Sequence, residues 1–208
     1  QEYGLYPNIT AYELLDHLAA LKGILNTQNR KEVVTSLLHK TNLYQHRKQK
    51  LGGYSGGMKR RFGIAQALLA NPRLIIVDEP TAGLDPTERN RFHKLLCELG
   101  NQAIVILSTH IVEDVKELCT QMAIINEGQV LLQDEPLKAI AAMKGNIYRK
   151  TIQSKNLGHY QKKYRVISER LLKGRPLIHV YSDANPGDGI ESVEADLSDV
   201  YFSRIAQP

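Results

Sequence analysis

The stretch "RLIIVDEP", Arg73–Pro80, decides the fold of this chain. Its apolar run, Leu74–Val77, is too short for a helix and is typical of a strand buried on both faces of a parallel sheet. Two acidic residues, Asp78 and Glu79, end the run, and Pro80 fixes the direction in which the chain leaves it. Because ligands of α/β proteins bind beyond the carboxyl ends of such strands, we expect a site here.

A second apolar run, "AIVILST" at Ala103–Thr109, follows a helix signal. In "DPTE", Asp85 is the expected N-cap of that helix and Glu88 is expected to close a capping box. Another helix and the hairpin "MAIINEGQVLLQ" come next, and this alternation implies a parallel sheet with crossover helices. In such a sheet, His110 lies at the same edge as Glu79.

The residues before this core carry helix signals and no strand pattern. Thr10 with Glu13 forms a capping box, Asn29 with Glu32 is expected to start a second helix, and Ser55 is the expected N-cap of a third. After residue 144 the pattern weakens to short strands, a polar loop and a final helix. We therefore predict an α/β fold with a helical subdomain over 1–71, a catalytic core over 72–144 and a small α+β appendage over 145–208.

Asp78 and Glu79 are neighbours on an extended chain, so their side chains point to opposite sides and are suited to different tasks. One carboxylate is able to hold Mg²⁺, and the other is able to orient or deprotonate an attacking water. His110 is able to donate a hydrogen bond to a phosphate oxygen that gains charge in the transition state. The alternative is that the two acids only cap the following turn and that His110 is a surface histidine.

The glycine-rich stretch "LGGYSGGMKRR" is spaced like a phosphate-binding P-loop but lacks its key residues. Met58 stands where the P-loop lysine belongs, and Lys59 stands where serine or threonine belongs. What is left is Ser55 at a helix N-terminus followed by Gly56 and Gly57, an arrangement that suits an anion. A glycine-rich turn with no ligand is the alternative.

Together these motifs resemble one family, the ATP-binding cassette (ABC) ATPases, from Gln1 to about Lys138. "YSGGM" at Tyr54–Met58 is similar to the family signature, "LIIVDEP" to its Walker B strand and "STH" to its switch-histidine loop. "AGLDP" at Ala82–Pro86 resembles the D-loop, and the first residues resemble the Q-loop. The tail, ending "VEADLSDVYFSRI", is similar to the C-terminal extension of prokaryotic export-type ATPases.

The resemblance implies a P-loop NTPase-like core, ATP and Mg²⁺ as cofactors, and a role for each matching residue. Glu79 and His110 are then catalytic, Asp78 binds the metal, and Gln1 senses the metal or the attacking water. The nucleotide is shared by two domains arranged head to tail. Ser55, Gly56 and Gly57 would then contact the nucleotide that is bound to the partner domain's P-loop. Asp85 would link the two domains.

The same resemblance implies that the family's own P-loop lies upstream of Gln1, so we expect the 208 residues alone to be inactive. The parent protein would be the ATP-hydrolysing subunit of a transporter, on the cytoplasmic face of the cell membrane beside a permease subunit. No apolar run approaches the roughly 20 residues of a membrane-spanning helix. The sequence does not determine whether the two domains of the dimer are identical or different.

Two other functions stay open, and the first of them rests on the uneven charge of the chain. The net charge is +5, and residues 144–175 hold ten Lys and Arg against the single acid Glu169. Such a stretch suits RNA, DNA or anionic lipid, although a solvated surface is the simpler interpretation. An ABC-type ATPase acting on ribosomes or nucleic acid is thus one alternative, although we expect no nucleic-acid partner. An inert fragment or binding module is the other.

Overall fold

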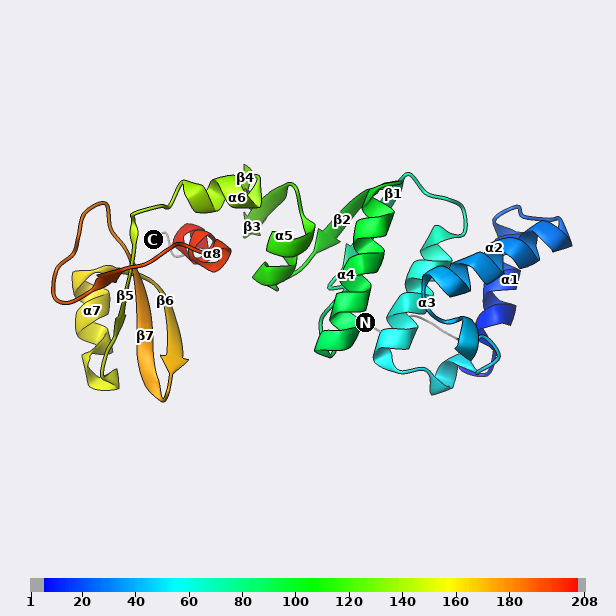
Figure 1. Ribbon diagram of the computed structural model, residues 1–208, viewed down its shortest axis with the longest axis horizontal. Coiled ribbons are helices and arrows are strands. Elements are labelled where there is room, and N and C mark those ends of the chain that lie inside the picture. The colour runs from blue at the N-terminus through cyan, green and yellow to red at the C-terminus, as the bar shows by residue number, and fades with distance from the viewer. Residues whose placement is uncertain (1–5, 206–208) are drawn as a thin grey trace. The chain divides into compact units, whose positions relative to one another are not determined.

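The computed structural model describes residues 6–205 of the chain (Figure 1). Gln1, which the family resemblance places in a Q-loop, lies outside the described residues. The chain divides into two compact units, residues 1–110 and 111–208. The mixed α/β fold class is confirmed, while the predicted three-part division stays a prediction.

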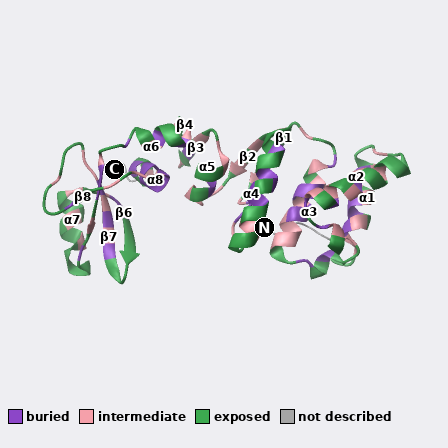
Figure 2. Ribbon diagram, viewed as in Figure 1, coloured by how far each residue is buried: buried purple, intermediate pink, exposed green. Residues whose placement is uncertain are grey.

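The N-terminal part of the first unit is helical, as predicted. It contains α1 (Ala11–Leu21), α2 (Thr27–Lys40) and α3 (Gly56–Leu68), with 3₁₀ turns at Tyr44–His46 and Leu51–Gly53. These helices enclose an apolar core, in which the bulkiest fully buried side chains are Phe62, Leu15, Leu38, Leu43 and Leu51. Figure 2 shows the buried faces of α1 and α3. The signature-like turn is therefore attached to a packed helical core.

The predicted start of the second helix was wrong by one turn. Asn26 is the N-cap of α2, and its side-chain oxygen accepts the backbone N–H of Asn29 at 2.9 Å. Glu32 does not close a box with Asn29, because its carboxylate accepts a hydrogen bond from Gln28 at 2.7 Å. Asn is a strong capping residue at either position, so propensity alone did not distinguish them.

Asn26→Ala is expected to lower the free energy of unfolding by about 1 kcal/mol, because it leaves the N–H of Asn29 without its cap. Asn29→Ala is the matched control, since the Asn29 backbone N–H stays capped in that variant. Urea denaturation of both variants measures the difference. An equal loss in the two variants would contradict the assigned cap.

The rest of the first unit is a strand–helix–strand unit. Strands β1 (Leu74–Asp78) and β2 (Ile104–Ser108) are parallel, and Asp78 is paired with Ser108 at their carboxyl ends. The crossover helix α4 (Pro86–Gly100) packs against the sheet (Figure 1). Its buried apolar residues are Phe92, Leu95, Leu96 and Leu99.

The prediction that both faces of these strands are buried was wrong. Ile75 is 3% exposed, whereas Ile76 is 70% and Ile104 is 67% exposed. Successive side chains of a strand point to opposite faces, and within residues 6–205 only one face of this sheet is covered. A continuous apolar run indicates that both faces suit burial, but it does not indicate what covers them.

The second unit begins with α5 (Val112–Leu118) and the antiparallel hairpin of β3 (Met122–Asn126) and β4 (Gln129–Asp134). The hairpin turns at Glu127 (φ 48°) and Gly128 (φ 77°), as predicted, because a two-residue turn of this kind needs positive φ at both positions. Within the described chain β3 pairs only with β4.

The remainder of the second unit is the small α+β arrangement that the sequence suggested. A four-stranded sheet has the order β6–β7–β5–β8. Its strands are β5 (Ile147–Thr151), β6 (Arg165–Leu172), β7 (Arg175–Tyr181) and β8 (Glu191–Ser192). Two short helices that the sequence analysis did not predict, α6 (Pro136–Ala141) and α7 (Leu157–Lys163), precede and follow β5. A 3₁₀ turn, Ser154–Asn156, leads into α7.

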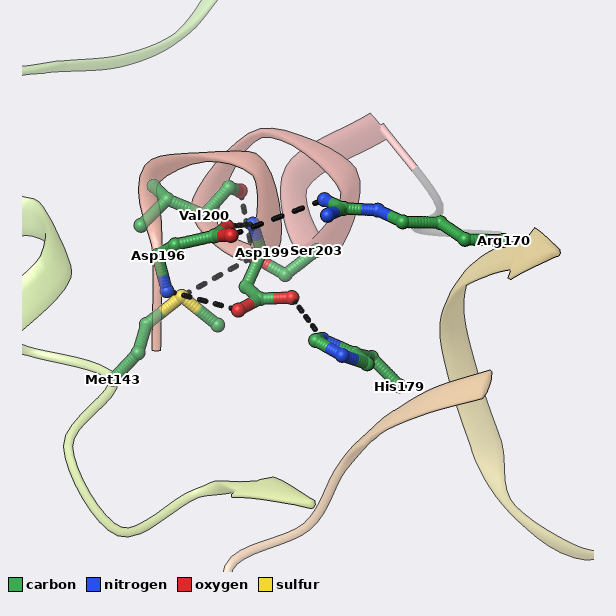
Figure 3. Close-up of polar contacts among 7 residues, drawn as sticks. All are labelled: Met143, Arg170, His179, Asp196, Asp199, Val200 and Ser203. Carbon is green, nitrogen blue, oxygen red and sulfur yellow. Dashed lines mark hydrogen bonds and ion pairs between the residues drawn. The ribbon is translucent and has the colours of Figure 1, made fainter. Parts of the chain in front are cut away.

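The final helix, α8 (Leu197–Ile205), is held to the second unit's sheet by a buried acid–histidine pair. Asp199 is fully buried, and its Oδ1 lies 2.7 Å from Nδ1 of His179 on β7 (Figure 3). The second oxygen accepts the backbone N–H of Asp196 at 2.9 Å, while the Asp196 side chain accepts the N–H of Asp199 at 3.0 Å. Both oxygens of the buried carboxylate are thus satisfied.

Candidate functional site

The first candidate site lies where β1 and β2 end. Asp78 is the last residue of β1, and the chain then turns sharply at Glu79, which has a positive φ of 45°. The backbone N–H of Glu79 donates to the carbonyl oxygen of Ser108 at 2.9 Å. Positive φ is uncommon for residues other than glycine and often marks a functional position.

Glu79 and His110 are brought together, as the parallel register predicts. Oε1 of Glu79 accepts the backbone N–H of His110 at 3.1 Å and lies 2.8 Å from the His110 ring Nδ1. The His110 side chain itself is 72% exposed. One oxygen of the glutamate is therefore fixed by a histidine whose ring is still open to a ligand.

The other oxygen of Glu79 is the unusual atom of this site. Oε2 is buried and has no hydrogen-bond partner among the described residues. A buried polar oxygen without a partner costs free energy, so in native proteins it generally meets a water or a ligand group. This geometry suits a carboxylate that orients a water molecule.

Asp78 fits the part of a magnesium ligand. Its Oδ1 accepts a hydrogen bond from the hydroxyl of Ser108, which orients the exposed carboxylate. Mg²⁺ is commonly held by one or two carboxylates together with waters and phosphate oxygens, so a single oriented aspartate suffices. No cluster of three potential metal-ligating side chains occurs within residues 6–205. Ser108 was not predicted as a site residue, although it was part of the "STH" motif.

The second candidate site is the turn at the start of α3. The Ser55 hydroxyl accepts the backbone N–H of Met58 at 3.2 Å, which makes it the predicted N-cap. A Cβ added at Gly56 would meet nothing within 4 Å, so this backbone is open to close approach. A Cβ at Gly57 would lie 3.3 Å from both Leu84 and Glu88. Gly57 therefore packs closely against α4 and the turn before it, which the sequence did not reveal.

Asp85 caps α4 as predicted, but Glu88 does not close the box. The Asp85 Oδ1 accepts the N–H of Glu88 at 3.0 Å. The Glu88 carboxylate instead forms ion pairs with the buried Arg61 on α3 and, at 2.8 Å, with Arg91. Pairing with two arginines outweighs a hydrogen bond to an exposed helix end. Sequence reasoning missed this link, since Arg61 and Glu88 are far apart in the chain.

Within the described part of the chain, no hydrogen bond or ion pair joins the Ser55–Gly57 turn to Asp78, Glu79 or His110. The structure therefore presents two separate groups of site residues in the first unit. None of the helices within residues 6–205 is long and apolar enough to span a membrane.

The chain is similar to several known proteins. Residues 1–82 match the family model described as ABC transporter. The "Uncharacterized ABC transporter ATP-binding protein YxlF" of Bacillus subtilis (strain 168) is 33% identical over 76% of this chain and 53% of its own length. The "Probable multidrug ABC transporter ATP-binding protein YbhF" of Escherichia coli (strain K12) is 29% identical over 90% of this chain and 33% of its own.

A solved structure is also similar. It is the dimeric, post-hydrolysis state of the ATP-binding cassette MJ0796 bound to ADP and Pi. Its TM-score is 0.57 at 26% identity, over 65% of this chain and 60% of that one. The mixed α/β fold is therefore that of the P-loop NTPase class. The matches support an ATP-binding cassette ATPase domain in this chain, which spans about half or less of the relatives described above.

Proposed function

We propose that this chain is part of the ATP-hydrolysing subunit of an ABC transporter of the export type. The observation that carries the proposal is the Glu79 carboxylate, with Oε1 held by His110 and a buried Oε2 that has no partner among the described residues. Such an oxygen is placed to accept a hydrogen bond from an attacking water and to take up its proton. His110 contributes by orienting Glu79 and by contacting the γ-phosphate.

Mg²⁺ and ATP are the cofactors that these residues suit. Asp78 would hold the ion, directly or through a water, and the ion when bound neutralises charge on the phosphate oxygens. Gln1, outside the described residues, is proposed to sense the ion or the water. The 208 residues contain no G-x-x-x-x-G-K-S/T sequence, so in this proposal a P-loop comes from the rest of a longer protein and from its partner domain.

The partner is proposed to be a second ABC domain arranged head to tail. Ser55 and Gly56 present a hydroxyl and an open backbone at a helix N-terminus, which favours a phosphate group belonging to the opposite domain. Asp85 would link the two halves. The similar solved structure is dimeric, which supports this arrangement.

Transport is supported by the relatives' names. YbhF is named a probable multidrug ABC transporter ATP-binding protein. Its match covers 90% of this chain and thus most of the second unit. We propose that the helices between Thr10 and Ala70 dock on a permease subunit at the inner face of the cell membrane. Affinity purification of the longer protein from detergent extracts tests this. Recovery of a permease supports transport, whereas salt-sensitive binding to RNA or DNA duplexes supports the nucleic-acid alternative.

His110→Ala in the longer protein is expected to lower the rate of ATP hydrolysis by about 100-fold, because a donor to the developing phosphate charge is lost. ATP affinity should stay within a factor of about three, since the histidine acts mainly in the transition state. Phosphate release and equilibrium nucleotide binding measure the two effects. His159→Ala, which alters a histidine of the second unit, is the control. Unchanged hydrolysis by His110→Ala would contradict the assigned role.

A further inference from the structure

A small cavity outside both candidate sites is lined by four basic side chains. It has a volume of about 200 Å³ and lies between the end of α2, the middle of α3 and the middle of α4. The basic residues are Lys40, Arg61, Arg91 and Lys94. Neither the family motifs nor the proposed transport cycle assigns a task to this place.

The positive charge of the cavity is only partly balanced. Among residues 6–205 the one acid that pairs with these side chains is Glu88, which contacts Arg61 and Arg91. Lys40 only donates to the neutral side chain of Gln102, at 3.4 Å. Gathering like charges without counterions is unfavourable, and a bound anion relieves this cost.

Arg61 provides an independent observation. The residue is 8% exposed, and while its Nη1 is paired with Glu88, its Nε is buried and has no partner among the described residues. Guanidinium N–H groups are strong donors with a planar fork that matches phosphate and carboxylate oxygens. Burying one such donor unpaired costs free energy, which an acceptor that reaches it would offset.

We infer that this cavity binds a phosphate oxyanion, either free inorganic phosphate or the phosphate of a small ester. The charge of the lining favours a dianion over a monoanion. A cavity of about 200 Å³ is smaller than the roughly 300–1,000 Å³ of typical ligand pockets, so a whole nucleotide does not fit. This inference goes beyond the proposed ATPase function and does not depend on it.

The position of the cavity gives the anion a structural effect. Glu88 contacts Arg61 and Arg91 in the cavity, and its carboxylate also lies against Gly57, where a Cβ would be 3.3 Å away. An anion on the two arginines competes with Glu88 for their N–H groups. Binding is therefore expected to weaken the link between α4 and the Ser55–Gly57 turn.

Calorimetric titration of the 208-residue chain with inorganic phosphate, at constant ionic strength and without nucleotide, tests the inference. We expect saturable binding with a Kd of about 1 mM or tighter. Lys94→Gln should weaken it about tenfold, since an exposed lysine is removed from the cavity without disturbing the buried core. Lys31→Gln, an exposed lysine of α2 that does not line the cavity, is the matched control.

Two further titrations identify the source of the phosphate group. If glycerol 3-phosphate binds more tightly than inorganic phosphate, the ligand of the cavity is a phosphate ester. If inorganic phosphate binds more tightly, the ligand is the free ion. Acetate, which models a protein carboxylate, should bind at least tenfold more weakly than phosphate. The inference is overturned by acetate binding equal to phosphate binding, by equal effects of Lys94→Gln and Lys31→Gln, or by no saturable binding.

Discussion

Glu79→Gln in the longer protein is expected to lower the rate of ATP hydrolysis by about 1,000-fold while ATP remains bound. The amide keeps the shape of the side chain and can still accept the N–H of His110, but it cannot take up a proton from the attacking water. ATP then stays between the two domains, and the dimer does not separate.

The measurement combines steady-state phosphate release with size-exclusion chromatography in the presence of Mg²⁺ and ATP. The variant should elute as a dimer that retains ATP, whereas the unmodified protein turns it over. Glu98→Gln, which changes an exposed glutamate of α4, should hydrolyse ATP at the normal rate. Normal turnover by Glu79→Gln would refute the assignment of Glu79 as the group that activates the water.

Asp199→Asn is expected to lower the free energy of unfolding of the second unit by about 3 kcal/mol at pH 7. The side chain is fully buried, and its Oδ1 lies 2.7 Å from His179, so the change disrupts a desolvated pair and leaves the histidine without its charged acceptor (Figure 3). Chemical denaturation of the chain, followed by signals of the second unit, measures the loss. Glu191→Gln, an exposed acid of β8, is the control and should change stability by less than about 0.5 kcal/mol.

The same pair predicts how stability depends on pH. Burial alone raises the pKa of Asp199, but the hydrogen bonds from His179 and the Asp196 N–H outweigh it and hold the pKa below its usual value. The contribution of Asp199 is therefore present above the unfolded pKa of about 3.9 and is lost as the pH falls through the lower folded value. The difference between the parent chain and Asp199→Asn should shrink below about pH 4. A difference that grows in acid would contradict this sign.

Much of the fold could be predicted because its signals are local. The N-caps Thr10, Ser55 and Asp85 fix helix starts through contacts three residues away, and the Glu127–Gly128 turn fixes its own hairpin. The error at α2 was also local, since Asn26 and Asn29 are equally good caps. Only the packed helix shows which N–H each one meets.

The ion pairs and packing contacts of the sites could not be predicted, because they join distant residues. Glu88 leaves its expected capping box for Arg61 on another helix, and Gly57 packs against Leu84 and Glu88. Side-chain pairing over such separations depends on how helices pack, which no local pattern encodes. The cavity lined by Lys40, Arg61, Arg91 and Lys94 also arises from the packing of α2, α3 and α4.

By itself, the sequence determined the class of the protein and the chemical groups it carries. Alternating apolar runs fix a parallel strand–helix–strand unit, and parallel strands place Glu79 and His110 at one edge. Only the tertiary structure decided that His110 holds one oxygen of Glu79, while the other oxygen is buried without a partner among the described residues. It also decided that one face of β1 and β2 is exposed. The physical reason is that strand pairing follows from local periodicity, whereas burial and hydrogen-bond satisfaction depend on every element that packs nearby.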